Sequence, residues 1–237
     1  ERKVAVAGSG GPTGEIMEPV GSLSEADAVA AFEEQIAGLM EGGADVVWAE
    51  TISAEAEIRA ASQAAANLGA PFCATLSFDT AGRTMMGVTS EDWARIAAGL
   101  PAVPVAFGAN CGTGASDLLR TVLGITGAAP EAAVIAKGNA GIPKFVDGHI
   151  HYDGTPELMA DYAVLARDAG ARLIGGCCGT RPEHLRAMRA ALEVHVPGPR
   201  PALEEIRTRL GEFSSARDGT EGEESSRRRR RRRGATG

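Results

Sequence analysis

Short apolar runs alternate along this chain with longer, alanine-rich amphipathic stretches. The runs are rich in Val, Ile, Phe and Ala and contain few polar residues. Continuous runs of this kind are typical of strands that are buried on both faces of a parallel sheet. The pattern predicts strands at residues 4–8, 45–50, 71–77, 103–108, 133–137 and 172–176.

The stretches between these strands carry residues that are typical of helix boundaries. Ser24 is a suitable N-cap for a helix that ends before Gly42, and Gly69 and Gly170 follow two later helices. A chain in which strands and helices alternate folds as a parallel sheet covered by helices. The sequence predicts helices at residues 25–41, 54–68, 90–98, 117–124, 156–169 and 182–193.

The spacing of these units favours a barrel over an open sheet. From residue 8 to residue 176 the chain makes five steps of about 34 residues, and eight such units would make about 270 residues, close to the size of a (β/α)8 barrel. Six units are present, and the first strand stands at the N-terminus. We therefore expect an α/β fold, a (β/α)8 TIM barrel that lacks its first two βα units in this chain. A complete six-stranded doubly wound sheet is the alternative.

The composition indicates a folded protein with a polar tail. The 237 residues are 44% hydrophobic and 23% charged, without a signal-peptide pattern or an apolar run of about 18 residues that could span a membrane. We therefore expect a cytoplasmic protein without membrane partners. The expected domains are a barrel at residues 1–196, a C-terminal helical extension at residues 197–213 and a disordered tail at residues 214–237.

Charge is distributed unevenly between the predicted fold and this tail. The formal net charge is −7 although residues 227–233 are seven consecutive arginines. Without the arginine run the protein would be seven charges more negative, so the predicted fold is acidic. An acidic surface argues against a nucleic-acid partner for the folded domain. We interpret the arginine run as a solvated tail.

Three of the four cysteines follow predicted strands. Cys111 follows one strand, and the adjacent Cys177 and Cys178 follow another. Adjacent cysteines are poorly placed for ordinary disulfides, and a protein without a secretory signal keeps its thiols reduced. Because the carboxyl ends of parallel strands converge, three thiolates can meet there and bind zinc with a fourth position open. A thiol that binds a metal is deprotonated, so the predicted chemistry is alkylation of a substrate thiol.

Two cysteine-containing motifs resemble those of the homocysteine S-methyltransferase family. GANCG at residues 108–112 and GGCCGT at residues 175–180 are similar to the two zinc-ligand motifs of that family. The resemblance covers about residues 4–192 and implies a (β/α)8 barrel. Further segments match in the expected order: VAGSGGPTGE at residues 6–15, VVWAET at 46–51, SFDTAGRTMMG at 77–87, KGNAGIP at 137–143 and TRPEHLRAM at 180–188.

The resemblance implies a site and an activity. It makes Cys111, Cys177 and Cys178 the ligands of Zn²⁺ and the catalytic residues. It makes Glu50 and Asn110 the substrate-binding residues, of which Glu50 binds the α-ammonium group of homocysteine and Asn110 lies beside the metal and supports the site. The implied reaction transfers a methyl group to the zinc-bound thiolate of homocysteine and gives methionine. Two features depart from the family: the opening strand with its DGxxGT-type motif is absent, and a glycine at position 10 replaces a bulkier apolar residue.

The methyl donor is left open by these motifs. Several segments resemble the homocysteine module of cobalamin-dependent methionine synthase more than the animal betaine enzymes, because Thr51 stands where the latter have an aromatic residue. The donor is then a methyl-corrinoid or methyl-folate system on a separate protein, or betaine.

Two other functions remain as alternatives at this point. One is a non-catalytic zinc module or a vicinal-dithiol redox module, and the other is a lysine-dependent aldolase-type barrel that uses Lys137. Cys73 lies inside a predicted strand and is interpreted as a packing residue. His149 and His151 lie in a segment rich in Asp and Gly, which is interpreted as a solvated loop.

Overall fold

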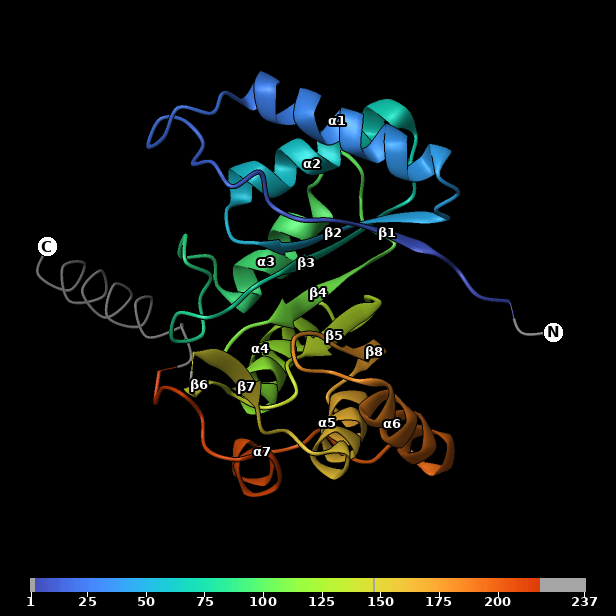
Figure 1. Cartoon of the computed structure of the whole chain (residues 1–237), viewed down its shortest axis with the longest axis vertical. Helices are drawn as coiled ribbons and strands as arrows, with labels where there is room; N and C mark the ends of the chain where they lie inside the picture. Colours follow the sequence, from blue (N-terminus) through green and yellow to red (C-terminus); the bar gives the residue numbers. More distant parts are fainter. Residues whose placement is uncertain (1–2, 147, 218–237) are drawn as a thin grey trace, which may run out of the picture.

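The computed structural model describes residues 3–146 and 148–217, in which strands and helices alternate as predicted (Figure 1). The strands of the main sheet are β1 (Ala7–Gly10), β2 (Val46–Ile52), β3 (Phe72–Leu76), β4 (Ala106–Cys111), β5 (Val134–Gly138) and β8 (Ala171–Gly176). The helices are α1 (Glu25–Glu41), α2 (Glu55–Leu68), α3 (Ser90–Ala98), α4 (Ala115–Ala128), α5 (Pro156–Asp168), α6 (Pro182–Val194) and α7 (Leu203–Leu210).

The strands of the main sheet are arranged in the order in which they occur in the chain. Every neighbouring pair is parallel, from β1 at one edge to β8 at the other. A doubly wound sheet reverses its strand order at a switch point, whereas a (β/α)8 barrel does not. Helices that follow one another also pack together, as α1 does with α2 and α5 with α6. The α/β fold is therefore consistent with part of a TIM barrel, as predicted.

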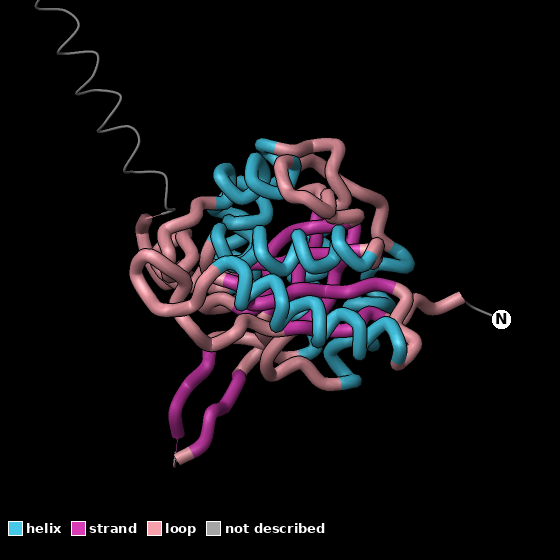
Figure 2. The backbone as a smooth tube through the Cα atoms, turned by 90° about the horizontal axis from the view of Figure 1, so that it is seen from above, coloured by secondary structure: helices cyan, strands magenta, loops and turns pink. Residues whose placement is uncertain are grey.

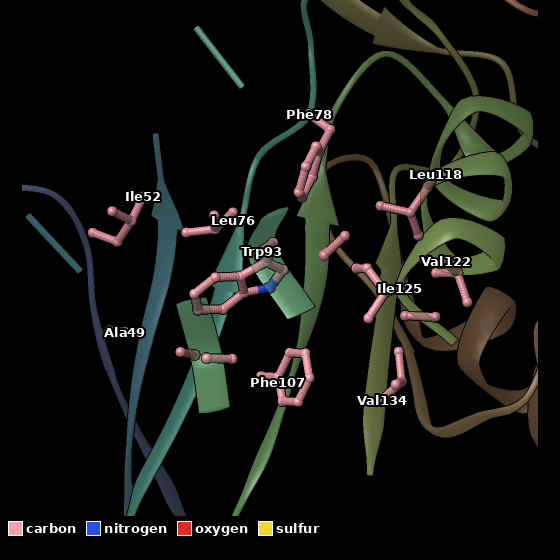
Figure 3. Close-up of a cluster of buried hydrophobic side chains, with 14 of the residues drawn as sticks. Ala49, Ile52, Leu76, Phe78, Trp93, Phe107, Leu118, Val122, Ile125 and Val134 are labelled. Carbon is pink, nitrogen blue, oxygen red and sulfur yellow. The ribbon is translucent and has the colours of Figure 1, made fainter. Parts of the chain in front are cut away.

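Apolar side chains from the sheet and from α3 and α4 form the core between the sheet and these helices (Figure 3). Trp93 of α3 is completely buried, and its ring meets that of Phe107 of β4 edge to face, with centroids 5.6 Å apart. The indole N–H of Trp93 donates a hydrogen bond of 2.9 Å to the carbonyl of Gly108, which satisfies its polar atom inside the core. This packing anchors β4, the strand that ends in Cys111.

Local capping explains why two helices have the predicted bounds. The Ser24 hydroxyl accepts a hydrogen bond of 3.1 Å from the backbone N–H of Asp27 at the start of α1. The Thr89 hydroxyl accepts one of 3.0 Å from the N–H of Asp92 at the start of α3. Because these signals lie within a few residues of the boundary they set, the predictions for α1 and α3 are confirmed.

The first strand begins three residues later than predicted. Ala7 is the first residue paired with β2, opposite Val46. Val4 and Val6 precede that pairing and are 76% and 56% exposed. The apolar run alone therefore misplaces the strand, because its position is decided by the pairing partner.

The segment around His149 and His151 is a β-hairpin, so the prediction of a loop is wrong, whereas the predicted exposure to solvent is confirmed. Strand β6 (Pro143–Val146) pairs antiparallel with β7 (His149–Tyr152), and the hairpin projects from the body of the molecule (Figure 2). Both histidines are exposed. The Asp-Gly dipeptide at residues 147–148 of the sequence is a strong hairpin signal, and it identifies this segment.

The first residues of the expected tail contact α4. The N–H of Ser214 donates a hydrogen bond of 3.0 Å to Asp117, and Arg120 donates one of 2.9 Å to the carbonyl of Ser215. The arginine run lies outside the described residues. In the part of the chain that the structure describes, no helix has both the length and the apolar character needed to cross a membrane.

Candidate metal centre

Cys111, Cys177 and Cys178 lie together at the carboxyl ends of two strands. Cys111 is the last residue of β4, and the other two follow β8, which is separated from β4 by β5. The Sγ atoms of Cys111 and Cys178 are 3.7 Å apart, and those of Cys177 and Cys178 are 4.0 Å apart. All three sulfur atoms lie within 4.8 Å of one another. The fold therefore brings the three cysteines together as the strand-end argument predicts.

These distances fit a tetrahedral metal ion. Zinc–sulfur bonds of about 2.3 Å in a tetrahedron place the sulfur atoms about 3.8 Å apart. Among the described residues, these three cysteines are the group of three or more potential metal ligands whose ligand atoms lie close enough together to bind one ion. Cys73 is buried against Ala106 and Ile135 and does not belong to it, in agreement with a packing role.

The backbone at Cys111 adopts a left-handed conformation. Its φ is 59°, and that of the following Gly112 is 71°. A positive φ is uncommon for a residue other than glycine and costs about 1–3 kcal/mol, so it persists where surrounding contacts hold it. The two left-handed residues end β4 and turn the chain beside its neighbour, β5.

Asn139 braces the two cysteine-bearing segments against each other, a role that the sequence analysis missed. Its side-chain oxygen accepts a hydrogen bond of 3.0 Å from the N–H of Cys178, and its amide donates one of 3.0 Å to the carbonyl of Gly112. The side chain is almost fully buried. Its place just after β5, between the strands that carry the cysteines, is the signal that could have identified it.

Asn110 connects the metal centre to β2. Its side-chain oxygen accepts a hydrogen bond of 2.9 Å from the N–H of Thr51, and its amide donates one of 2.8 Å to the Thr51 hydroxyl. The same amide lies 3.8 Å from the sulfur of Cys177. Asn110 is completely buried, and its contacts with Thr51 and Cys177 join the end of β2 to the cysteine cluster.

Proton loss from the cluster is unequal between Cys177 and Cys111. The hydrogen bond from Cys111 lowers the pKa of Cys177 against the effect of burial, with further lowering by the Asn110 amide and the charge of Lys137. The contact with Cys177, together with burial, raises the pKa of Cys111. The first negative charge of the cluster therefore resides on Cys177. A divalent cation would compensate further thiolates, because metal coordination requires deprotonated sulfur.

Glu50, near the end of β2, forms an ion pair with Lys137 of β5. The Ser9 hydroxyl donates a hydrogen bond of 2.5 Å to the other carboxylate oxygen. Burial by itself raises the pKa of Glu50, but the hydrogen bonds from Lys137 and Ser9 and the charge of Lys137 hold it below its usual value. Glu50 is thus an ionised carboxylate near the carboxyl ends of the strands, the same edge of the sheet that carries the cysteines. The nitrogen of Lys137 is engaged by this carboxylate, which disfavours a role as a Schiff-base nucleophile.

The sequence matches a family model over most of its length. The model for homocysteine S-methyltransferase matches residues 1–192. This range includes the three cysteines, Asn110 and the Glu50–Lys137 ion pair.

Solved structures of homocysteine methyltransferase MmuM from Escherichia coli are similar to this chain. The apo form is 26% identical, with a TM-score of 0.64, over 79% of this chain and 62% of that one. The metallated form is 26% identical, with a TM-score of 0.56, over 68% and 51%. The oxidized form is 28% identical, with a TM-score of 0.54, over 68% and 52%. The chain therefore corresponds to less than two thirds of the length of these proteins.

Proposed function

This chain belongs to the homocysteine S-methyltransferase family, and on that premise we propose that it transfers a methyl group to the thiolate of homocysteine and gives methionine. The observation that carries the proposal is the meeting of the Cys111, Cys177 and Cys178 sulfur atoms within 4.8 Å of one another. A site made of three thiolates suits the binding of a further thiol better than the activation of water, because its charge already exceeds that of a divalent metal.

We propose Zn²⁺ as the resident metal, with Cys111, Cys177 and Cys178 as its ligands. Zinc bound by three protein ligands keeps a fourth position for substrate and holds a substrate thiol there as a thiolate. Asn110 and Asn139 keep the ligands in place through the hydrogen bonds described above. Because metal binding requires reduced cysteines, we also propose that the protein works in the cytoplasm.

Glu50 is proposed to bind the α-ammonium group of homocysteine. It is ionised, partly accessible and held on two sides by Ser9 and Lys137. A carboxylate that accepts a hydrogen bond from an ammonium group makes a charge-assisted contact, which is about twice as strong as a neutral one. Held in this way, the substrate presents its sulfur to the methyl carbon in one orientation.

Two classes of methyl donor are compatible with a bound homocysteine thiolate. One is a methyl-corrinoid or methyl-folate system on a separate protein, and the other is betaine. Single-turnover assays with methylcobalamin and with betaine distinguish the two, because each donor leaves a different product.

A homocysteine titration of the cobalt-substituted protein tests the proposed function. We expect thiolate-to-cobalt absorption to increase as homocysteine binds, together with release of a proton. A non-catalytic metal module would bind cobalt without responding to homocysteine, and an aldolase-type barrel would not retain the metal. Binding of homocysteine without either signal would show that its sulfur is not on the metal and would overturn the mechanism.

A further inference from the structure

The Glu50–Lys137 ion pair links two strands that are not neighbours in the sheet. Glu50 lies on β2 and Lys137 on β5, with β3 and β4 between them. In the register of the sheet, Lys137 lies between Asn110 on β4 and Gly175 on β8, two residues before Cys177. The side chains of Glu50 and Lys137 are 19% and 23% exposed, so a small solute can reach both charges.

The side chain of Trp48 holds the Lys137 ammonium in place. The indole N–H of Trp48 donates a hydrogen bond of 3.1 Å to the Thr75 hydroxyl, which fixes the ring. Lys137 Nζ lies 5.1 Å from the centre of that ring, a cation–π distance. A Cβ atom at position 175 would lie 3.4 Å from Cγ of Lys137, an ordinary van der Waals contact, so β8 borders the lysine side chain. The charge is therefore positioned before any substrate arrives.

The ammonium of Lys137 has donor capacity that the described residues do not use. An ammonium group has three N–H donors. Among the described residues, its hydrogen-bond acceptor is one oxygen of Glu50, and its other contact is the face of Trp48. A donor that is fixed, charged and accessible is suited to bind a carboxylate.

We propose that Lys137 binds the α-carboxylate of homocysteine while Glu50 binds its α-ammonium group, so that the ion pair is a receptor for a zwitterionic α-amino acid. This inference rests on the proposed function. A zwitterion placed against the pair sets each of its charges beside an opposite one, and the net charge of the site does not change. A thiol without the ammonium group makes no charged contact with Glu50, and a thiol without the carboxylate makes none with Lys137.

Three thiols distinguish direct binding of the carboxylate by Lys137 from an indirect effect of Lys137 through Glu50. They are L-homocysteine, aminopropanethiol, which lacks the carboxylate, and sulfanylbutanoate, which lacks the amine. Their affinities are measured by the absorption of the cobalt-loaded full chain. For the wild type, we expect aminopropanethiol to bind about 10- to 100-fold more weakly than homocysteine, the effect of one charge-assisted hydrogen bond. Equal affinities would overturn the inference without use of any variant.

Variants assign the effect to Lys137. Lys137→Met should weaken homocysteine about 10- to 100-fold and leave the affinity for aminopropanethiol within about threefold of wild type. Lys137→Arg, which keeps a charged donor, should restore most of the loss. Glu50→Gln should give the complementary pattern, with weaker binding of homocysteine and aminopropanethiol and little change for sulfanylbutanoate. Cobalt stoichiometry shows that each variant is folded.

Two different results would contradict the carboxylate role of Lys137 and the proposed function, respectively. If Lys137→Met weakens homocysteine and aminopropanethiol equally, Lys137 acts by holding Glu50, and the carboxylate role is wrong. If the wild type binds cobalt but none of the three thiols changes its absorption, the proposed function fails and takes this inference with it.

Discussion

The carboxamide of Asn110 forms two hydrogen bonds with Thr51, one to its N–H and one to its hydroxyl. Thr51 has a φ of 65°, a strained conformation for a β-branched residue. Its neighbour in the chain is Glu50, and the neighbour of Asn110 is Cys111. One pair of hydrogen bonds thus sets the position of a proposed substrate-binding carboxylate relative to a proposed metal ligand.

Asn110→Ala should reduce the free energy of unfolding by about 1–3 kcal/mol, because it leaves the Thr51 N–H without its partner and empties a buried position. Urea denaturation measures the change. Asn67→Ala is the control, since that amide forms its hydrogen bonds on the exposed surface of α2, and it should change stability by less than about 0.5 kcal/mol. Equal losses in the two variants would contradict the clamping role of Asn110.

The protein should bind one zinc ion per chain. Cys177→Ala and Cys178→Ala should lose it, because two thiolates and no further nearby ligand remain among the described residues. Cys73→Ala should retain the metal, since Cys73 packs inside the sheet. Metal analysis after dialysis gives the stoichiometry. Loss of zinc from the Cys73 variant to the same extent would rule out the assignment.

Glu50→Ala should leave zinc bound but weaken homocysteine by about 1.5–3 kcal/mol, because a charge-assisted hydrogen bond to the ammonium group is lost. This corresponds to about a 10- to 150-fold change in affinity, measurable by calorimetry. Glu193→Ala, which removes an exposed carboxylate on α6, is the control and should leave affinity unchanged. Wild-type affinity in the Glu50 variant would show that the ammonium binds elsewhere.

The stabilising effect of Glu50 should disappear in acid. Its pKa is lower in the folded protein than in the unfolded chain, where it is about 4.3. Glu50 therefore adds stability above the unfolded value, and that stability is lost as the pH falls through the folded value. The difference in unfolding free energy between wild type and Glu50→Gln should accordingly begin to shrink as the pH falls below about 5 and continue to shrink as the pH falls through the folded pKa. A difference that is constant with pH would contradict the ion pair.

Gly108→Ala should destabilise the sheet by about 1–3 kcal/mol or more, because a Cβ atom there would lie 2.0 Å from the carbonyl oxygen of Ile135 on β5. Gly38→Ala is the matched control. Gly38 lies inside α1 with open space where its Cβ would be, so alanine should stabilise the helix by about 0.5–1 kcal/mol. Thermal or urea unfolding of both variants should therefore give shifts of opposite sign.

The sequence predicts those features that depend on neighbours in the chain. The bounds of α1 and α3 follow from Ser24 and Thr89, whose hydroxyls reach N–H groups three residues away. The apolar runs locate the six strands of the main sheet to within about three residues, although Val4 and Val6 are exposed because strand pairing starts at Ala7. The hairpin at residues 143–152 was also within reach of the sequence, through its Asp-Gly dipeptide.

The meeting of Cys111 with Cys177 and Cys178 follows from the sequence by one further rule, that parallel strands end at a common edge. The rule brings the cysteines to one edge of the sheet. It does not supply the sulfur distances, because these depend on the left-handed backbone at Cys111 and on the hydrogen bonds of Asn139.

Tertiary structure alone decided which side chains work as pairs. Glu50 and Lys137 are 87 residues apart in the chain, and Asn110 and Thr51 are 59 apart. Their contacts depend on the register of strands that are not neighbours in the sheet, and on its curvature. The sequence around a residue indicates that the residue lies near the end of a strand. It does not determine which side chain on another strand it meets, because the register and curvature of the sheet are set by the packing of the whole sheet against its helices.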